Sequence, residues 1–173
     1  MTRRRLIIIT AAALAAAAVQ AGCAGPALSG AVVTLDEAGS TVCSPADADG
    51  RTVFGISAIQ NVSSSAVEIG DAALVDPGGM ELLGLELRAT DDPDAYIVGF
   101  DYDRFGPSAV ALPHQMAGGE TAVTLVGVRV APGASGSADG VTLSFRGNGG
   151  GGAVETRIAM QVVPAGEVCG STD

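Results

Sequence analysis

Short apolar segments alternate with turn-forming clusters along most of this 173-residue chain. No segment carries the period of an amphipathic helix. The breaks between them are rich in Asp, Pro and Gly, as in Asp76-Pro77-Gly78-Gly79 and Ala131-Pro132-Gly133-Ala134, and these residue types favour turns. About nine short strands with breaks at such intervals indicate an all-β chain folded as a single antiparallel β-sandwich, and we predict an immunoglobulin-like arrangement.

The strands that precede the C-terminal region are predicted from apolar or alternating composition. They lie at Ala31–Leu35, Val53–Gln60, Ala66–Val75, Met80–Arg88, Ala95–Tyr102, Ala109–Leu112 and Ala122–Val130.

Two alternating runs near the C-terminus predict a hairpin. Val141–Arg146 places Val, Leu and Phe on one face and Thr, Ser and Arg on the other, and Val154–Val163 alternates in the same way. The segment Asn148–Gly152 between them is rich in glycine, which accepts the positive φ that tight hairpin loops require. This pattern favours an antiparallel pair closed by a glycine-rich reversal.

The N-terminus has the pattern of an export signal. Arg3, Arg4 and Arg5 precede an apolar run from Leu6 to Val19. That run of 14 residues is short for a membrane-spanning helix, which needs about 20, and it fits the apolar centre of a cleavable signal peptide.

The end of this signal, Val19-Gln20-Ala21-Gly22-Cys23, resembles a bacterial lipoprotein signal, although Gln20 stands where that family has an aliphatic residue. The resemblance implies that residues 1–22 are removed and that the thiol of Cys23 is acylated. Residues 23–30 would then form the lipidated cysteine and a short tether, and residues 31–173 the sandwich domain. The implied location is the extracytoplasmic face of the cell membrane, with membrane lipid as the partner of the acylated Cys23.

Two alternatives concern export. Val19-Gln20-Ala21 also satisfies the small-x-small rule of ordinary secretory cleavage, which would leave a secreted protein with a free thiol at Cys23. Thr2-Arg3-Arg4-Arg5-Leu6-Ile7 resembles a twin-arginine signal, so the route stays open between the general secretory and twin-arginine systems.

The cysteine count supports the lipoprotein interpretation. The chain holds three cysteines, Cys23, Cys43 and Cys169, and an odd cysteine in an exported protein needs an explanation. Acylation of Cys23 would leave Cys43 and Cys169 as a pair in an oxidising compartment, and we predict a disulfide between them. No CxxC spacing accompanies them, so a cysteine metal site is not expected.

Charge limits the possible partners. After removal of the signal, six arginines stand against nineteen acidic residues, a net charge of −13, and the chain has no lysine. A basic patch for nucleic acid is therefore missing, and attachment to anionic lipid would need the acyl chains. No cofactor motif occurs, and a protein or glycan partner is left unidentified.

An aromatic cluster offers a candidate binding surface. Tyr96, Phe100, Tyr102 and Phe105 lie within ten residues. If this segment is a strand, Tyr96, Phe100 and Tyr102 share one face, which suits either a central core strand or a recognition surface for a protein or sugar.

His114 and Met116 are the candidate metal ligands. Imidazole and thioether suit copper, and the pair resembles the His and Met clusters of small periplasmic copper chaperones. An extracytoplasmic copper-binding protein is therefore the alternative function, although His114 is the only histidine of the chain and would otherwise be a surface loop residue.

The acidic clusters indicate solvated surface charge. Asp47-Ala48-Asp49-Gly50 resembles half of a calcium loop, but Pro45 and Ile56 occupy positions where that loop needs acidic residues. Asp91, Asp92, Asp94, Asp101 and Asp103 form a second acidic group on a predicted turn and strand end.

No catalytic signature accompanies these features. Gly133-Ala134-Ser135-Gly136-Ser137 lacks the last glycine of a nucleophile elbow, and a single histidine offers little for a serine triad. We therefore expect a protein that is not an enzyme, namely a membrane-anchored extracytoplasmic lipoprotein with a binding or structural role.

Overall fold

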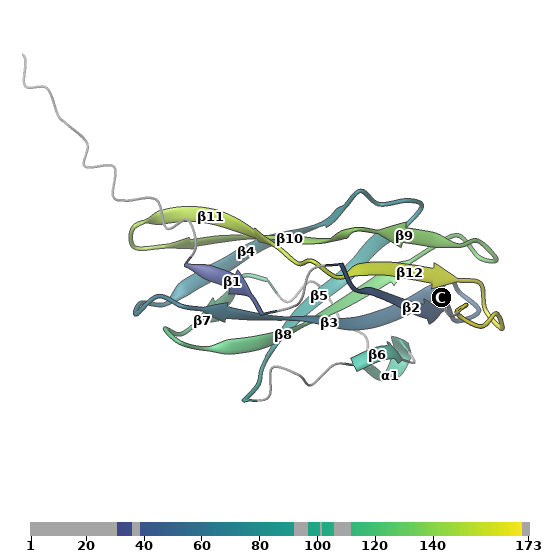
Figure 1. Cartoon of the computed structure of the whole chain (residues 1–173), viewed down its shortest axis with the longest axis horizontal. Helices are drawn as coiled ribbons and strands as arrows, with labels where there is room; N and C mark the ends of the chain where they lie inside the picture. The colour runs from purple at the N-terminus through teal and green to yellow at the C-terminus, as the bar shows by residue number, and fades with distance from the viewer. Residues whose placement is uncertain (1–30, 36–38, 92–96, 101, 106–111, 171–173) are drawn as a thin grey trace, which may run out of the picture.

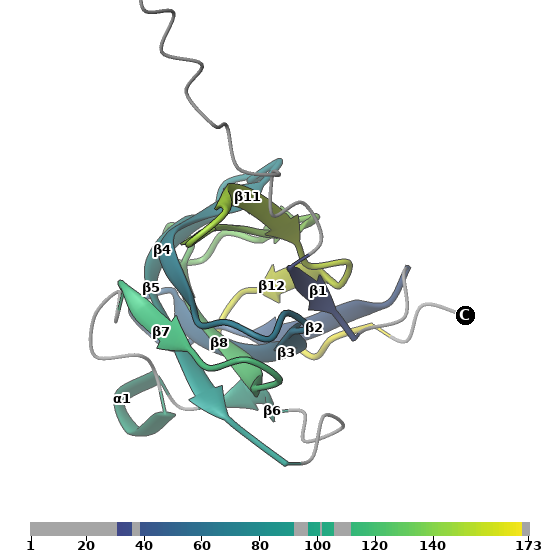
Figure 2. The same cartoon turned by 90° about the vertical axis from the view of Figure 1, so that its left-hand side faces the viewer.

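The computed structural model of the chain describes residues 31–35, 39–91, 97–100, 102–105 and 112–170. Strands dominate this part, and the helix α1 (Tyr102–Phe105) is only four residues long. The strands stack in two layers (Figure 2), so the all-β prediction is confirmed. The predicted signal peptide and tether fall on residues 1–30, outside the described residues. None of the described helical residues forms a segment long and apolar enough to span a membrane.

The first layer is an antiparallel sheet of five strands. Its main path runs in the order β1 (Val32–Thr34), β3 (Arg51–Asn61), β8 (Thr121–Arg129) and β5 (Glu81–Ala89). The fifth strand, β6 (Ile97–Phe100), pairs with Val53–Gly55 of β3, while β1 pairs with Ile59–Asn61 (Figure 1).

The second layer combines a four-stranded and a three-stranded sheet. The four-stranded sheet runs in the order β11 (Gly150–Glu155), β10 (Gly140–Gly147), β4 (Val67–Val75) and β7 (His114–Met116). The three-stranded sheet runs in the order β2 (Thr41–Pro45), β12 (Ala159–Val163) and β9 (Gly136–Ala138). The β2–β12 pair is parallel, a departure from the antiparallel pairing of the other described strands.

One long hairpin joins these two sheets. Strand β9 leads into β10, and β11 leads into β12. Thr142 pairs with Glu155 and Ala138 pairs with Met160, so the second arm holds one more residue than the first between the two pairs. This extra residue is a β-bulge, which bends a strand and increases its twist. The hairpin prediction is confirmed, but the bulge divides the predicted single strand 154–163 into β11 and β12.

The strand order is that of an immunoglobulin-like sandwich. The sheet β1-β3-β8-β5 matches the A-B-E-D sheet of that fold, and β4, β10 and the β11–β12 arm match C, F and G. The first strand is shared between the layers, since β1 pairs with β3 and β2 pairs with β12. The predicted arrangement is therefore confirmed by the connectivity itself.

The core lies between the layers and is built mainly from aliphatic side chains. Its largest fully buried members include Phe54, Ile56, Ile59, Ile69, Leu85, Met116, Leu143, Met160 and Val126. Val53 and Leu125 belong to the opposite face of the first sheet, yet they are 0% and 1% exposed. Helix α1 lies on that side (Figure 2), and the burial of these two side chains shows that this part of the face is not open to solvent.

The predicted strands differ from the described ones at Tyr102 and in two strands that were not predicted. Of the described residues in the predicted strand 95–102, Ile97–Phe100 form β6, whereas Tyr102 begins α1. The predicted strand 109–112 falls largely outside the described residues, and β7 forms just after it. Strands β2 and β9 were not predicted, since Thr-Val-Cys-Ser-Pro and Gly-Ser-Ala lack an apolar alternation.

Candidate binding surfaces

A disulfide joins Cys43 of β2 to Cys169 beyond the end of β12, which confirms the predicted pair. The two Cα atoms are 5.8 Å apart, and the two cysteines are 126 positions apart in sequence. Closing so long a loop stabilises the folded chain by roughly 4–5 kcal/mol in the chain-entropy model. Cys23 lies outside the described residues.

Arg51, at the start of β3, gathers three carboxylates. Its guanidinium lies 3.0 Å from Asp47, 3.3 Å from Asp49 and 3.0 Å from Asp103 of α1. The Asp47 carboxylate also accepts hydrogen bonds from the backbone N–H groups of Asp49 and Arg51. Burial tends to lower the pKa of Arg51, but the hydrogen bond and charge of Asp47, with the charges of Asp103 and Asp49, leave that pKa raised.

The ion pairs of Arg51 explain the acidic motif at residues 47–50. Asp47 and Asp49 are directed at an arginine of the same chain, so the half-loop that resembled a calcium site is a turn closed by an ion pair. Among the described residues, no group of three or more His, Cys, Asp or Glu side chains is placed to hold a metal ion. The ion pairs of Arg51 were not predicted from the sequence, although the position of Asp47 four residues before Arg51 was a visible signal.

The aromatic cluster is only partly described. Tyr96 lies outside the described residues, Phe100 ends β6, and Tyr102 and Phe105 begin and end α1. Tyr102 is half-buried, and the guanidinium of Arg51 lies 5.1 Å from the centre of its ring. Because Tyr102 is helical, it does not share a strand face with Phe100. A binding surface at these aromatic residues stays a prediction.

The two candidate metal ligands lie on β7 and differ in access to solvent. Met116 is 0% exposed and belongs to the core. His114 is half-buried, and its Nε2 lies 3.8 Å from Glu120 Oε1. That nitrogen is buried without a hydrogen-bond partner in the described part of the chain. The second Glu120 oxygen accepts a hydrogen bond from the Ala117 N–H at 2.7 Å.

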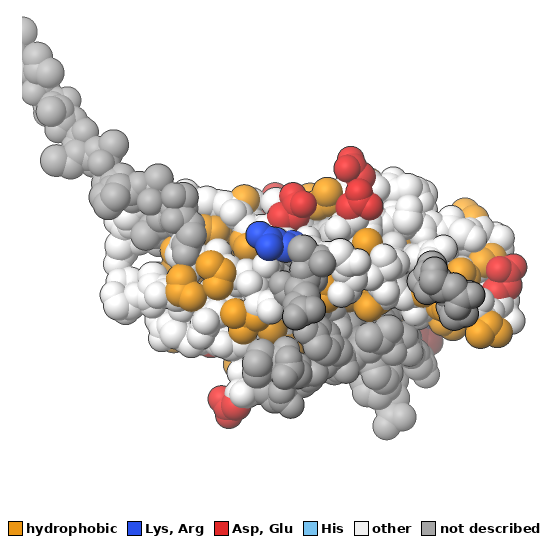
Figure 3. All heavy atoms as spheres, viewed as in Figure 1, with side chains coloured by type: hydrophobic (Ala, Val, Ile, Leu, Met, Phe, Trp, Pro, Cys, Tyr) orange, Lys and Arg blue, Asp and Glu red, His pale blue; other side chains and the backbone are white. Residues whose placement is uncertain are grey.

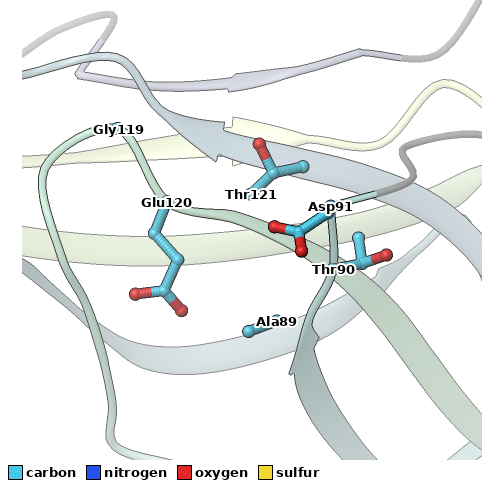
Figure 4. Close-up of a pocket in the computed structure, with 6 residues that line it drawn as sticks. All are labelled: Ala89, Thr90, Asp91, Gly119, Glu120 and Thr121. Carbon is cyan, nitrogen blue, oxygen red and sulfur yellow. The ribbon is translucent and has the colours of Figure 1, made fainter.

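A polar hollow of about 460 Å³ opens beside Glu120 at one end of the sandwich. Asp91 after β5 and Glu120 before β8 line it, and the rest of the lining is Ala89, Gly119 and two threonines, Thr90 and Thr121 (Figure 4). Asn61 fixes the loops at the same end, because its side-chain amide donates to the carbonyls of Ser65 and Ala117 at 2.9 Å each.

The outer face of the four-stranded sheet carries a polar row across three strands. Gln115 of β7 donates to Glu68 of β4 at 2.8 Å, and Arg146 of β10 donates to the same carboxylate at 2.7 Å. Two hollows of about 380 and 310 Å³ flank the row. Both hollows lie on the described outer surface and share Glu68 and Arg146 in their linings.

A further hollow separates the edge strands of the two layers. It measures about 510 Å³ and is lined by Val32, Val33, Thr34, Ala153, Val154, Glu155 and Arg157. These residues belong to β1, to β11 and to the bulge that follows β11. Figure 3 views the face that carries β1, β11 and β12, and there the apolar side chains are interrupted by polar atoms and lie near acidic and basic groups.

Comparisons with known proteins give only weak likenesses. No family model and no curated protein matches the chain. Among solved structures, the ASH/PapD-like domain 7 of human CEP192 is 9% identical with a TM-score of 0.35, covering 96% of this chain and 99% of that domain. A family 123 glycoside hydrolase from Clostridium perfringens is 10% identical with a TM-score of 0.36, covering 72% of this chain and 23% of the hydrolase. Both likenesses are too weak to bear on function.

Proposed function

We propose that this protein is a membrane-anchored extracytoplasmic lipoprotein whose immunoglobulin-like domain is a non-catalytic binding or structural module. The observation that carries the proposal is the disulfide between Cys43 and Cys169. It accounts for two of the three cysteines and leaves Cys23, at the end of the signal-like segment, as the cysteine available for acylation.

Compartment chemistry supports this assignment. Disulfides form and persist in oxidising, extracytoplasmic environments and are rare in the cytosol. A domain with a net charge of −13 after removal of residues 1–22 is repelled by anionic lipid, so acyl chains are the attractive force that would hold it at a membrane. The seven residues from Ala24 to Gly30 span at most about 25 Å, which would keep the domain close to the surface.

The described side chains favour binding over catalysis. The acidic partner that faces the only histidine of the chain is Glu120, at 3.8 Å. That distance is longer than the hydrogen bond that orients a catalytic base. The hollows are instead lined by carboxylates, small residues and edge-strand backbone, which suits contact with a partner.

Membrane fractionation of three forms of the full chain in a bacterial host tests the anchor. The natural chain is expected in the membrane fraction, and Cys23→Ser is expected in the soluble extracytoplasmic fraction. Cys43→Ser is the matched control, because it also removes one thiol but should stay in the membrane fraction. A Cys23→Ser variant that stays membrane-bound would exclude lipid at Cys23 as the anchor.

A further inference from the structure

Among the described strands, only β10 pairs with β11, so the other edge of β11 is open. The hairpin closes at the Gly147–Gly150 pair, and the Thr156 N–H donates to Val141 O at 2.9 Å. Hydrogen-bonded and non-hydrogen-bonded pairs alternate in an antiparallel ladder. The N–H and C=O groups of the intervening odd residues therefore point away from β10, and these residues are Gly151, Ala153 and Glu155. All three are exposed.

This edge is the least protected among the described strands. Proteins protect sheet edges with short strands, charges or proline. Strands β1 and β7 have three residues each, β2 ends in Pro45, and β5 carries Glu81, Glu86 and Arg88. Strand β11 has six residues, no proline, and Glu155 as its only charged side chain.

We propose that β11 pairs antiparallel with β11 of a second copy of this chain, with Ala153 on the two-fold axis. In this register Ala153 faces Ala153 of the other copy, and Gly151 faces Glu155. Each outward N–H then meets an outward C=O, because the pairs 153–153 and 151–155 join only residues whose backbone groups point to the edge. Among the described strands, β1 lies across the hollow from this edge, and it forms no strand pair with β11.

Charge complementarity supports this partner. The polar row Gln115–Glu68–Arg146 stops at Gly151, which pairs with Arg146 and has no side chain. In the proposed register, Glu155 of the second copy lies across Gly151, two strand spacings of about 4.8 Å from Arg146. Long side chains can meet over a glycine at that spacing. The Arg146 side chain is 74% exposed, so it can accept a second carboxylate beside Glu68.

Cysteine cross-linking tests the register directly. Full-length Ala153→Cys on a Cys23→Ser background, purified from the soluble fraction and treated with a mild oxidant, is expected to form a covalent dimer. Facing residues of a hydrogen-bonded pair have Cα atoms about 5.5 Å apart, which suits a disulfide. The matched control is Ser144→Cys, which is also exposed and pairs with Ala153. It lies one strand further from the axis in each copy, so about 15 Å separates the two Cα atoms, and it should not cross-link.

Two further variants test the association without a cross-link. Ala153→Pro removes an N–H that β10 does not use, and edge strands tolerate proline, so the variant should be folded and monomeric by light scattering. Glu155→Arg should also weaken the dimer, because it places a second positive charge across Gly151 from Arg146 of the other copy. A monomeric natural chain, equal cross-linking of the two cysteine variants, or a cross-link from Ala153→Cys to a different protein would overturn the proposal.

Discussion

The Thr156 hydroxyl accepts a hydrogen bond from the Val141 N–H at 2.8 Å, and the Thr156 N–H donates to Val141 O at 2.9 Å. Thr156 is fully buried. These two hydrogen bonds join the two arms of the hairpin at the bulge, where the hairpin passes from the four-stranded to the three-stranded sheet. The side chain of Thr156 therefore supplies an acceptor that the bulged backbone does not.

Replacing Thr156 with valine keeps the shape but removes that acceptor. The Val141 N–H would be buried and unpaired, and such a group costs about 1–3 kcal/mol. Chemical denaturation should show Thr156→Val to be less stable than the natural chain by this amount. The exposed Thr41→Val is the control, and equal stability of the two variants would contradict this role.

Gly140 occupies the opposite strand at the bulge and has no room for a side chain. Its φ is +154°, and an added Cβ would lie 2.4 Å from the Thr156 carbonyl oxygen. Gly140→Ala should therefore lose about 1–3 kcal/mol or more through backbone strain, measured as a lower thermal midpoint. Gly70→Ala is the matched strand control, since nothing lies within 4 Å of its added Cβ. A stable Gly140→Ala would show that the bulge relaxes freely.

The disulfide is predicted to contribute strongly to stability. Cys43→Ser opens a loop of 126 residues, so the free energy of unfolding should fall by roughly 4–5 kcal/mol. Denaturation with and without reductant measures the same quantity in the natural chain. Cys23→Ser should leave the unfolding curve unchanged, and a loss of stability there would mean that Cys23 takes part in the fold.

Copper binding should not depend on His114. Met116 is 0% exposed, and no second histidine exists in the chain. Titration of Cu(I) and Cu(II) into the natural chain and His114→Ala should give the same affinity. A clear loss of affinity in His114→Ala would revive the copper-binding alternative and would require Met116 to leave the core.

Alternation in the sequence was enough to predict most of the sandwich. The apolar face of Val154–Val163 was predicted, and Thr156, Ile158, Met160 and Val162 are indeed buried. The bulge within that segment was not visible, because an extra residue changes pairing without interrupting an alternating pattern. The disulfide followed from counting cysteines, since two of the three had to pair once Cys23 was set aside.

The candidate surfaces were harder to predict because they depend on contacts distant in sequence. Arg51 meets Asp103 only because α1 lies against the start of β3. The strand prediction for residues 95–102 failed at Tyr102, where the ring contacts Arg51 from a helix. Strand β9 is too short and polar to show a pattern, and it forms because β12 pairs with it.

The most direct test of the account is the mass of the mature protein isolated from the membrane fraction. We predict a chain that begins at Cys23, carries the added mass of acyl chains there, and contains an intact Cys43–Cys169 disulfide. A chain that retains Met1, or one cut after Ala21 with an unmodified Cys23, would contradict it.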